Sequence, residues 1–353
     1  MTGMRLLVLG SSWFLGRAVV DAAKAAGWGD IVTFRRGHAD SGADPAGVRT
    51  MHGDYADPAA VAQLAAAGPW DAVIDNLAYT PRETLAVARA LEPVAGRYVL
   101  ISTVSVYQGW PTEPLTEDSP VLDCAPDAGP NPGYNGNPGP STYGFGKAGC
   151  ERAVMESFGP DRTAVLRPGV ILGPHEYVGR LPWWLRRIER GGQVLAPGSP
   201  DRKIQPVDVR DVAEFAVRCA GGVAGVFNTT GSGRETMGDF LAACRTVTGS
   251  DAELTWITDE QWLADQGVQQ WTELPLWRTY AGTWAVDASR ARAAGLVTRS
   301  LADTTADTWA WLNSGSGSMV AHERAGELGI TPEREAAILG VWRAREADRC
   351  GTD

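Results

Sequence analysis

Short apolar runs alternate with helical patterns through the first half of the chain, and this alternation limits the possible folds most. None of the runs has a polar residue at every second position, so each predicts a strand buried on both faces. Such strands fit a parallel sheet covered by helices, and the alternation predicts a doubly wound, Rossmann-type α/β fold. The predicted strands span residues 6–9, 31–34, 71–75, 98–102 and 163–167.

The second half of the chain is mixed and predicts a smaller α/β substrate lobe. We expect strands over 224–228 and 253–256 and helices over 236–247 and 301–312. Thr236 followed by Asp239 has the pattern of a helix N-cap, and Pro332 suits the first position of a last helix. The predicted dinucleotide-binding domain is 1–170, with 205–232 returning to it. Residues 171–204 and 233–353 then form the substrate lobe and C-terminal helices.

The composition excludes several classes of protein. Of the 353 residues, 32 are Lys or Arg and 42 are Asp or Glu, and the net charge of −10 argues against a nucleic-acid partner and gives no reason for a membrane one. No apolar stretch approaches the roughly 20 residues that span a bilayer. The five cysteines and four histidines show no metal-ligand spacing. We therefore expect a cytoplasmic protein with reduced thiols and no metal.

A glycine-containing turn follows the first predicted strand and opens the first helix. It reads Gly10-Ser11-Ser12-Trp13-Phe14-Leu15-Gly16. Such a turn brings backbone N–H groups and a helix N-terminus to a pyrophosphate. Trp13 stands where the middle glycine of the template belongs, and an ordinary strand-to-helix turn is the alternative.

Two arginines, Arg35 and Arg36, follow the second predicted strand. An acidic residue there would bind the ribose hydroxyls of NAD, whereas arginine suits the 2′-phosphate of NADP. These residues favour NADP, with NAD still possible. The alternative is a pair of solvated surface arginines.

Tyr143 and Lys147 lie four residues apart at the start of a predicted helix, which places them on one helix face. A free phenol has a pKa of about 10, and a nearby ammonium lowers that value. Such a pair can exchange a proton with a carbinol oxygen while a hydride moves. Thr103 and Ser105 lie where the predicted strand 98–102 ends, and a hydroxyl there can bind the reacting carbonyl. Local backbone capping is the alternative for these two residues.

Together these segments resemble the extended short-chain dehydrogenase/reductase family, in its NAD-dependent epimerase/dehydratase branch. The resemblance covers nearly the whole chain, because the matching motifs occur in the family's order. Besides the glycine turn and the Tyr143/Lys147 pair, they include the segments 75–78, 101–107, 166–174 and 205–213.

The resemblance implies roles for individual residues. Tyr143 would be the catalytic acid/base, and Lys147 its electrostatic partner and a ligand of the nicotinamide ribose. Thr103 would be the catalytic hydroxyl, with Ser105 as second choice. The implied cofactor-binding residues are Gly10, Ser12, Trp13, Phe14, Leu15, Gly16, Arg35, Arg36, Asp54, Ala78, Lys147 and Pro168.

Two departures from the family pattern narrow the expected chemistry. Trp13 replaces a glycine, so the pyrophosphate turn is expected to be wider, although a subgroup similar to chloroplast stem-loop-binding proteins keeps a large residue there turned outward. The family's 4,6-dehydratases carry Asp-Glu after the catalytic Thr, but this chain has Val104-Ser105. Dehydration by that mechanism is therefore not expected.

Three functions remain open on the sequence. The first is an NAD(P)-dependent reductase or dehydrogenase of a small carbonyl or alcohol, with Tyr143 as acid/base. The second is a redox-neutral epimerase of a sugar or nucleotide-sugar that retains NAD. The third is a cofactor-sensing or RNA-associated protein on the same fold.

Several segments have open roles around the substrate. The loop at 108–140 is expected to be a substrate-side lid, with a solvated insertion as the alternative. The candidates for the substrate pocket are His175, Glu176, Arg180, Trp183 and Trp184. Arg180, Arg186 and Arg187 would bind an anion or coat a helix. The last helix, after the Gly/Ser segment at 313–318, would be a lid or the arm of a homodimer.

Overall fold

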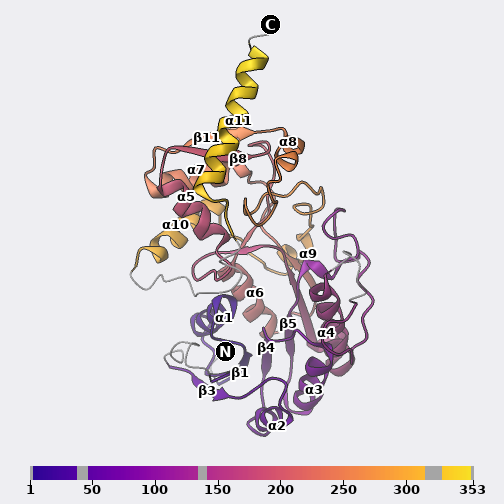
Figure 1. The fold of residues 1–353 in the computed structure, drawn as a ribbon. Helices are drawn as coiled ribbons and strands as arrows, with labels where there is room; N and C mark the ends of the chain where they lie inside the picture. The colour runs from indigo at the N-terminus through magenta and orange to yellow at the C-terminus, as the bar shows by residue number, and fades with distance from the viewer. Residues whose placement is uncertain (1–2, 38–46, 134–140, 315–327, 351–353) are drawn as a thin grey trace. The chain divides into compact units, whose positions relative to one another are not determined.

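The computed structural model describes residues 3–37, 47–133, 141–314 and 328–350 (Figure 1). The expected lid and the Gly/Ser segment each fall partly outside these residues, at 134–140 and 315–318. The chain divides into two compact units. The first contains Met1–Ile171, Pro206–Gly231 and Ala281–Thr298, and the second contains Leu172–Gln205, Ser232–Tyr280 and Arg299–Asp353.

A seven-stranded, all-parallel sheet forms the centre of the first unit. Its order is β10-β6-β5-β4-β1-β2-β3, which is the doubly wound topology predicted from the apolar runs. The strands are β1 (Arg5–Leu9), β2 (Asp30–Arg35), β3 (Arg49–His52), β4 (Ala72–Asp75), β5 (Tyr98–Ile101), β6 (Thr163–Pro168) and β10 (Gly225–Thr229).

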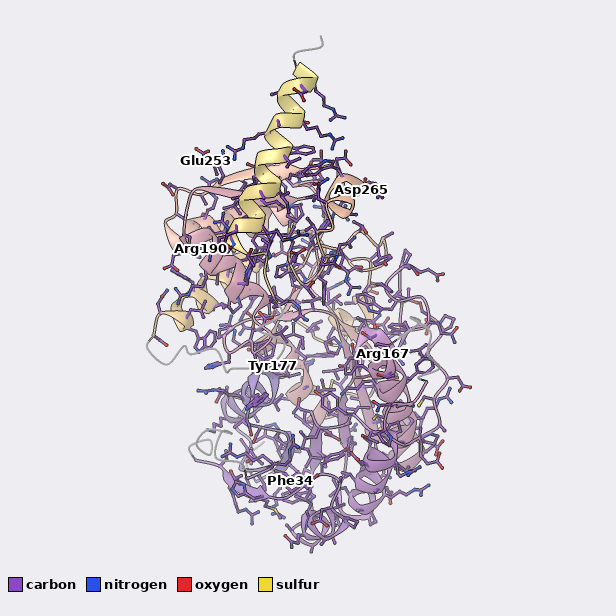
Figure 2. All side chains as sticks on the ribbon, in the orientation of Figure 1. Phe34, Arg167, Tyr177, Arg190, Glu253 and Asp265 are labelled. Atoms are coloured by element: carbon purple, nitrogen blue, oxygen red, sulfur yellow. The ribbon has the colours of Figure 1, made fainter. Side chains whose placement is uncertain are left out.

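Helices cover both faces of this sheet, as the buried strands require. On one face the core is completed by α1 (Phe14–Ala25), α6 (Val209–Ala220) and α9 (Ser289–Ala293). On the other face it is completed by α2 (Pro58–Ala66), α3 (Pro81–Leu91) and α4 (Thr142–Phe158). Figure 2 shows how densely side chains such as Phe34 fill the sheet region.

The register of the sheet brings the carboxyl ends of β1, β2 and β4 to the same edge. Leu9 at the end of β1 pairs with Phe34 of β2 on one side and with Asp75 of β4 on the other. The order of the strands reverses between β1 and β4, and ligands of doubly wound sheets bind at such a point. The glycine turn after β1 therefore lies at the expected place for a cofactor.

Two chain segments outside the sheet pack onto the first unit. Leu115 and Leu122, within the expected lid, are buried in a small core with Val104, Val106 and α4. Leu115 also forms a bridge with Val286, which holds the segment Ala281–Thr298 to this unit. From the sequence, this segment is expected in the substrate lobe. Its contact partner lies more than 160 residues earlier in the chain, and no local pattern indicates a contact over that separation.

The second unit has its own small parallel sheet of β8 (Gln193–Pro197) and β11 (Glu253–Ile257). Thr236 caps α7 (Met237–Thr248) with both hydrogen bonds of a capping box, and α10 (Leu301–Leu312) has the predicted bounds. The remaining helices are α5 (Arg180–Glu189), α8 (Glu260–Asp265) and α11 (Pro332–Cys350). The first unit also contains the short helices η2 (Glu92–Val94), η3 (Val104–Val106) and η4 (Pro160–Arg162) and the two-residue strand β9 (Val207–Asp208), which pairs with β7 (Ile171–Leu172).

Candidate active site

Three glycines allow α4 to lie unusually close to its neighbours. A Cβ at Gly144 would meet the Ser105 carbonyl oxygen at 2.3 Å, and one at Gly146 would meet the Tyr79 carbonyl oxygen at 2.8 Å. A Cβ at Gly149 would meet the Pro81 ring at 2.5 Å. Glycine costs about 1 kcal/mol relative to alanine in a helix interior. The close approach of α4 to the strand-end segments requires it here.

Tyr143 and Lys147 occupy one face of the first turns of α4. Tyr143 remains 41% exposed, whereas Lys147 is only 3% exposed. The Lys147 ammonium donates to the Ile101 carbonyl at the end of β5 (2.9 Å). It lies 4.4 Å from the ring centroid of Tyr79 and 6.0 Å from that of Tyr143. The buried Lys147 ammonium thus lies beside the accessible Tyr143 phenol ring.

The electrostatic surroundings of Lys147 keep it protonated. Burial lowers the pKa of the ammonium, but Coulombic interactions with Tyr143, Tyr79, Cys150 and Asp75 outweigh burial, so this pKa lies above its ordinary value.

Thr103 lies two residues beyond the carbonyl that accepts from Lys147. It is the N-cap of η3, and its Oγ1 accepts from the Ser105 N–H (3.2 Å). Its hydroxyl also donates to the Ser105 Oγ at 3.3 Å. The structure therefore places Thr103, Ser105 and Lys147 around the carboxyl end of β5. Both the capping role and a substrate-binding role are compatible with this position.

The glycine turn after β1 is held tightly. Gly10 has φ +81°, and its N–H donates to the Phe34 carbonyl (2.9 Å). A Cβ on Gly16 would lie 1.8 Å from the Gly10 carbonyl oxygen. Phe14 opens α1 with φ +33°, a left-handed conformation that is strained for a residue with a side chain. Trp13 is the N-cap of α1 and is 41% exposed.

The turn region fits a dinucleotide. Within the described residues, the buried Oγ of Ser11 and Oδ1 of Asn76 have no hydrogen-bond partner. Buried polar atoms are normally paired, so such atoms beside a glycine turn suit a polar ligand. Asn76 is held in place because its amide donates to the Leu9 carbonyl (3.2 Å).

The other predicted cofactor residues are spread around the same sheet edge. Arg35 is buried, and its guanidinium donates to the Ser12 Oγ of the turn (3.4 Å), whereas Arg36 is exposed. Asp54 is exposed, and its carboxylate accepts from the Ala56 N–H (2.9 Å). Ala78, three residues beyond β4, and Pro168, which ends β6, are buried. Leu15 is half-buried in the first turn of α1.

Comparison with known proteins gives this arrangement its family. A model described as the NAD dependent epimerase/dehydratase family matches residues 6–226, which contain the glycine turn and the Tyr143/Lys147 pair. The chain belongs to the NAD-dependent epimerase/dehydratase family. It is an enzyme of the extended short-chain dehydrogenase/reductase type. A search of curated protein sequences finds no match.

Solved structures of the same fold cover most of the chain at low sequence identity. The enzyme WbmG of Bordetella bronchiseptica, in complex with NAD, has a TM-score of 0.65 and 18% identity over 90% of this chain and 96% of its own. The UDP-glucose 4-epimerase of Thermotoga maritima has a TM-score of 0.63 and 17% identity, with 89% and 100% covered. The UDP-N-acetylglucosamine 4-epimerase of Bacillus cereus has a TM-score of 0.62 and 17% identity, with 88% and 97% covered.

In this member of the family, a buried ion pair lies next to the candidate catalytic residues. Arg167 of β6 donates twice to Glu151 of α4, at 2.9 and 2.5 Å, and both side chains are less than 10% exposed. Glu151 also accepts from the Ser102 hydroxyl (2.5 Å). Sequence reasoning missed this pair. The available signals were Arg167, a charged residue in the apolar strand 163–167, and Glu151, a charged residue one helical turn after Lys147.

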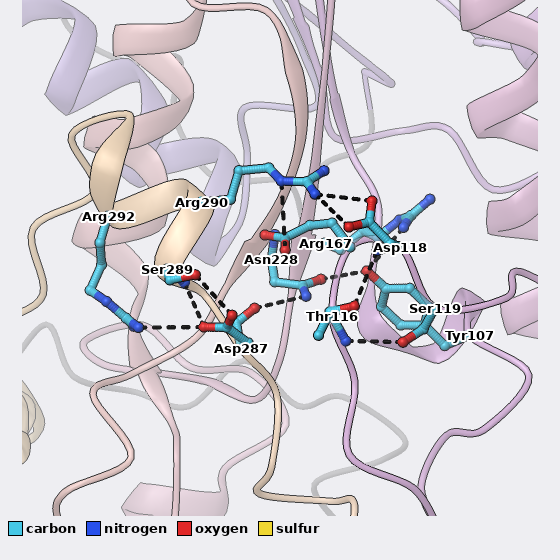
Figure 3. A network of polar contacts seen from close by, with 11 residues as sticks. Tyr107, Thr116, Asp118, Ser119, Arg167, Asn228, Asp287, Ser289, Arg290 and Arg292 are labelled. Carbon is cyan, nitrogen blue, oxygen red and sulfur yellow. Dashed lines mark hydrogen bonds and ion pairs between the residues drawn. The ribbon is translucent and has the colours of Figure 1, made fainter.

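The ion pair continues into the polar network drawn in Figure 3. Arg167 donates to the Tyr107 hydroxyl (2.9 Å), which donates to the Asn228 Oδ1 of β10 (2.7 Å). The Asn228 amide then donates to the Asp287 carbonyl (2.9 Å). Arg290 of α9 holds Asp118 by two bonds of 3.0 Å. The network ties α4, β6, β10 and the segment around Asp287 together within the first unit.

The arginines expected to bind an anion have different surroundings in the second unit. Arg187 is buried and pairs with Glu335 (2.6 Å), and Arg186 pairs with Glu189 (3.0 Å). Arg180 and Arg278 both lie over the ring of Trp271, 5.0 and 4.4 Å from its centroid. Burial lowers the pKa of Arg278.

The remaining pocket candidates also have local partners in that unit. The Trp184 indole is fully buried and donates to the Pro275 carbonyl (2.7 Å), whereas Trp183 packs edge-on against it. Glu176 is buried, which raises its pKa, and it accepts from the Arg180 and Leu181 N–H groups. His175 packs against Trp311.

Two further properties concern the whole described part of the chain. Across residues 3–37, 47–133, 141–314 and 328–350, the His, Cys, Asp and Glu side chains form no group that could hold a metal ion. In these same ranges, the helices are too short or too polar to cross a bilayer.

Proposed function

We propose that this enzyme is a redox-neutral epimerase of a nucleotide-sugar that keeps its nicotinamide cofactor through turnover. The accessible Tyr143 phenol above the buried Lys147 ammonium is the observation that carries the proposal. The sugar class is supported by the named activities of proteins with the same fold, which include two UDP-sugar 4-epimerases. This was the second of the three functions left open by the sequence.

When bound at the glycine turn, a nicotinamide cofactor would supply reversible hydride transfer at one sugar carbon. Tyr143 takes the proton of the hydroxyl on that carbon as the hydride leaves, and gives it back when the hydride returns to the other face. Lys147 places a positive charge beside the phenol oxygen during this exchange. Thr103 donates a hydrogen bond to the reacting oxygen and fixes its position.

The residues after Thr103 restrict what this enzyme does with such a substrate. Val104 is buried and Ser105 accepts from Thr103, so neither residue supplies the acid and base that expel water in the 4,6-dehydratases. We therefore propose epimerisation without dehydration.

A reductase of a small carbonyl is the second candidate, favoured by Arg35. Its guanidinium lies at the end of β2 and donates to Ser12 of the glycine turn, where it suits the 2′-phosphate of NADP. A reductase exchanges its cofactor at every turnover, whereas an epimerase retains it. We propose NADP if the enzyme is a reductase, and retained NAD if it is an epimerase.

Nucleotide analysis and turnover together test the proposal. The purified enzyme is denatured, released nucleotide is quantified by chromatography, and UDP-hexoses are followed by NMR without added cofactor. We expect about one NAD per chain, appearance of the epimer, and near-complete loss of turnover in Tyr143→Phe with the nucleotide still retained. Tyr280→Phe, which removes an exposed phenol of the second unit, is the matched control and should remain active.

Two results would contradict the epimerase. An empty protein that oxidises NADPH with small carbonyls would establish the reductase instead. Full activity of Tyr143→Phe would remove this residue from the mechanism.

A further inference from the structure

A carboxylate is buried at the end of β4, and sequence reasoning gave it no role. Asp75 is 0% exposed. Its Oδ2 accepts from the hydroxyls of Tyr55 (2.6 Å) and Tyr98 (2.5 Å), and its Oδ1 accepts from the Leu77 N–H (2.7 Å). Three donors converging on one carboxyl group favour its ionised form. A buried negative charge is expensive unless a positive charge lies near it.

The sheet register places this carboxylate near Lys147. Asp75 pairs with Leu100 of β5, and the next residue of β5, Ile101, accepts the hydrogen bond from the Lys147 ammonium. Lys147 is itself buried and bonded to that neutral carbonyl. The buried Asp75 carboxylate and the buried Lys147 ammonium thus lie at the same edge of the sheet, Asp75 opposite Leu100 and Lys147 bonded to the next residue, Ile101.

We propose that Asp75 is the positioning residue that keeps Lys147 an ammonium, and that Tyr55 and Tyr98 hold its carboxylate for this purpose. The inference rests on the proposed role of Lys147 and adds the group that maintains its charge.

The other groups around Lys147 are two phenols, a thiol and a carboxylate that already has a partner. Tyr79 and Tyr143 contribute phenol rings rather than carboxylates. Burial raises the pKa of the Cys150 thiol, one helical turn away, to about 12. Glu151, on the next turn, is already in its bidentate pair with Arg167.

The two buried groups influence each other in opposite directions. Burial raises the pKa of Asp75 above its ordinary value, although the two tyrosine hydroxyls, the Leu77 N–H and the charge of Lys147 oppose this. Asp75 in turn raises the pKa of Lys147 against the effect of burial. Removing the carboxylate should therefore lower the pKa of Lys147.

Lysine NMR measures this pKa directly, because the chain has only three lysines, Lys24, Lys147 and Lys203. The protein is labelled with [13Cε]lysine and titrated from pH 7 to 10.5, with Lys147→Met assigning the signal. In the wild type we expect Lys147 to lose its proton above the ordinary range of lysine. In Asp75→Asn its signal should titrate at a lower pH than in the wild type. Asp71→Asn, which removes an exposed carboxylate just before the same strand, is the matched control and should behave as wild type.

A double variant separates this role from a purely structural one. If Asp75 balances Lys147, then Lys147→Met should rescue part of the stability that Asp75→Asn loses, as measured by urea denaturation. If Asp75 only holds the hydroxyls of Tyr55 and Tyr98, adding Lys147→Met should not restore stability. This comparison remains informative even if Asp75→Asn alone folds poorly.

The outcomes distinguish this inference from the proposed function. An unchanged Lys147 titration in Asp75→Asn, or the absence of rescue, would overturn the inference whatever the enzyme's substrate. Loss of epimerase activity in every assay, with the titration shift present, would overturn only the function. If both the inference and the proposed function hold, the alkaline limb of the pH profile of kcat should move to lower pH in Asp75→Asn, with KM less affected.

Discussion

The buried pair of Glu151 and Arg167 makes a sharp prediction about stability. Replacing Glu151 with Gln preserves the shape of the side chain but removes its charge. Arg167 is then left as a buried cation whose side-chain partners, the introduced amide oxygen and the Tyr107 hydroxyl, are both neutral. Arginine has an ordinary pKa far above neutral, so Arg167 cannot adapt to the loss of Glu151 by losing its proton.

The size of the loss follows from the contacts. The substitution removes one charge from a bidentate pair and disturbs the 2.5 Å bond from Ser102. Removing one partner of a buried ion pair costs about 3–5 kcal/mol. For a unit of this size, each kcal/mol lowers the melting temperature by about 2–4 °C. We therefore expect a fall in melting temperature of about 6–20 °C.

Thermal and urea denaturation of a matched set of variants tests this reasoning. Asp123→Asn breaks the exposed pair with Arg152 on the same helix, and it should change stability by less than about 1 kcal/mol. The double variant Glu151→Met with Arg167→Met removes both charges and should lose less than Glu151→Gln alone. A Glu151→Gln protein as stable as the wild type, or a double variant less stable than the single one, would refute the argument.

Two further predictions concern the glycine turn and the strand that follows it. Gly16→Ala should abolish nucleotide retention, because its Cβ would meet the Gly10 carbonyl oxygen at 1.8 Å and force the turn apart. Circular dichroism checks that the variant is folded. A folded variant that still retains nucleotide would contradict this prediction. If the enzyme is the reductase, Arg35→Ala combined with Arg36→Ala should weaken NADPH binding at least tenfold more than NADH binding in calorimetric titration, because a 2′-phosphate loses its charge-assisted donors. Equal effects on both nucleotides would assign the two arginines to other roles.

The fold could be predicted from local patterns, since apolar runs and turn residues act within short stretches of chain. Each strand given a predicted range lies within one or two residues of it, whereas β3 and β8 had no predicted range. Thr236 and Asp239 form the expected capping box. The pairing of Tyr143 with Lys147 was equally local, because four residues span one helical turn. The scarcity of lysine in this chain would have strengthened that prediction.

The surroundings of those residues could not be predicted in the same way. Asp75 meets Tyr55 and Tyr98 across 20 and 23 residues, and Tyr107 meets Asn228 across 121 residues. No periodicity relates residues at such separations. The outward position of Trp13 likewise depends on the backbone of the turn.

The sequence alone thus determined the doubly wound sheet, the family and the residues proposed to carry the chemistry, because each depends on neighbours in the chain. Only the tertiary structure decided which charges are buried and what balances them. Burial and electrostatic pairing depend on distances in space, and parallel strands bring together residues far apart in sequence. The buried Asp75 near Lys147, and Glu151 bound to Arg167, exist as pairs only in the folded protein.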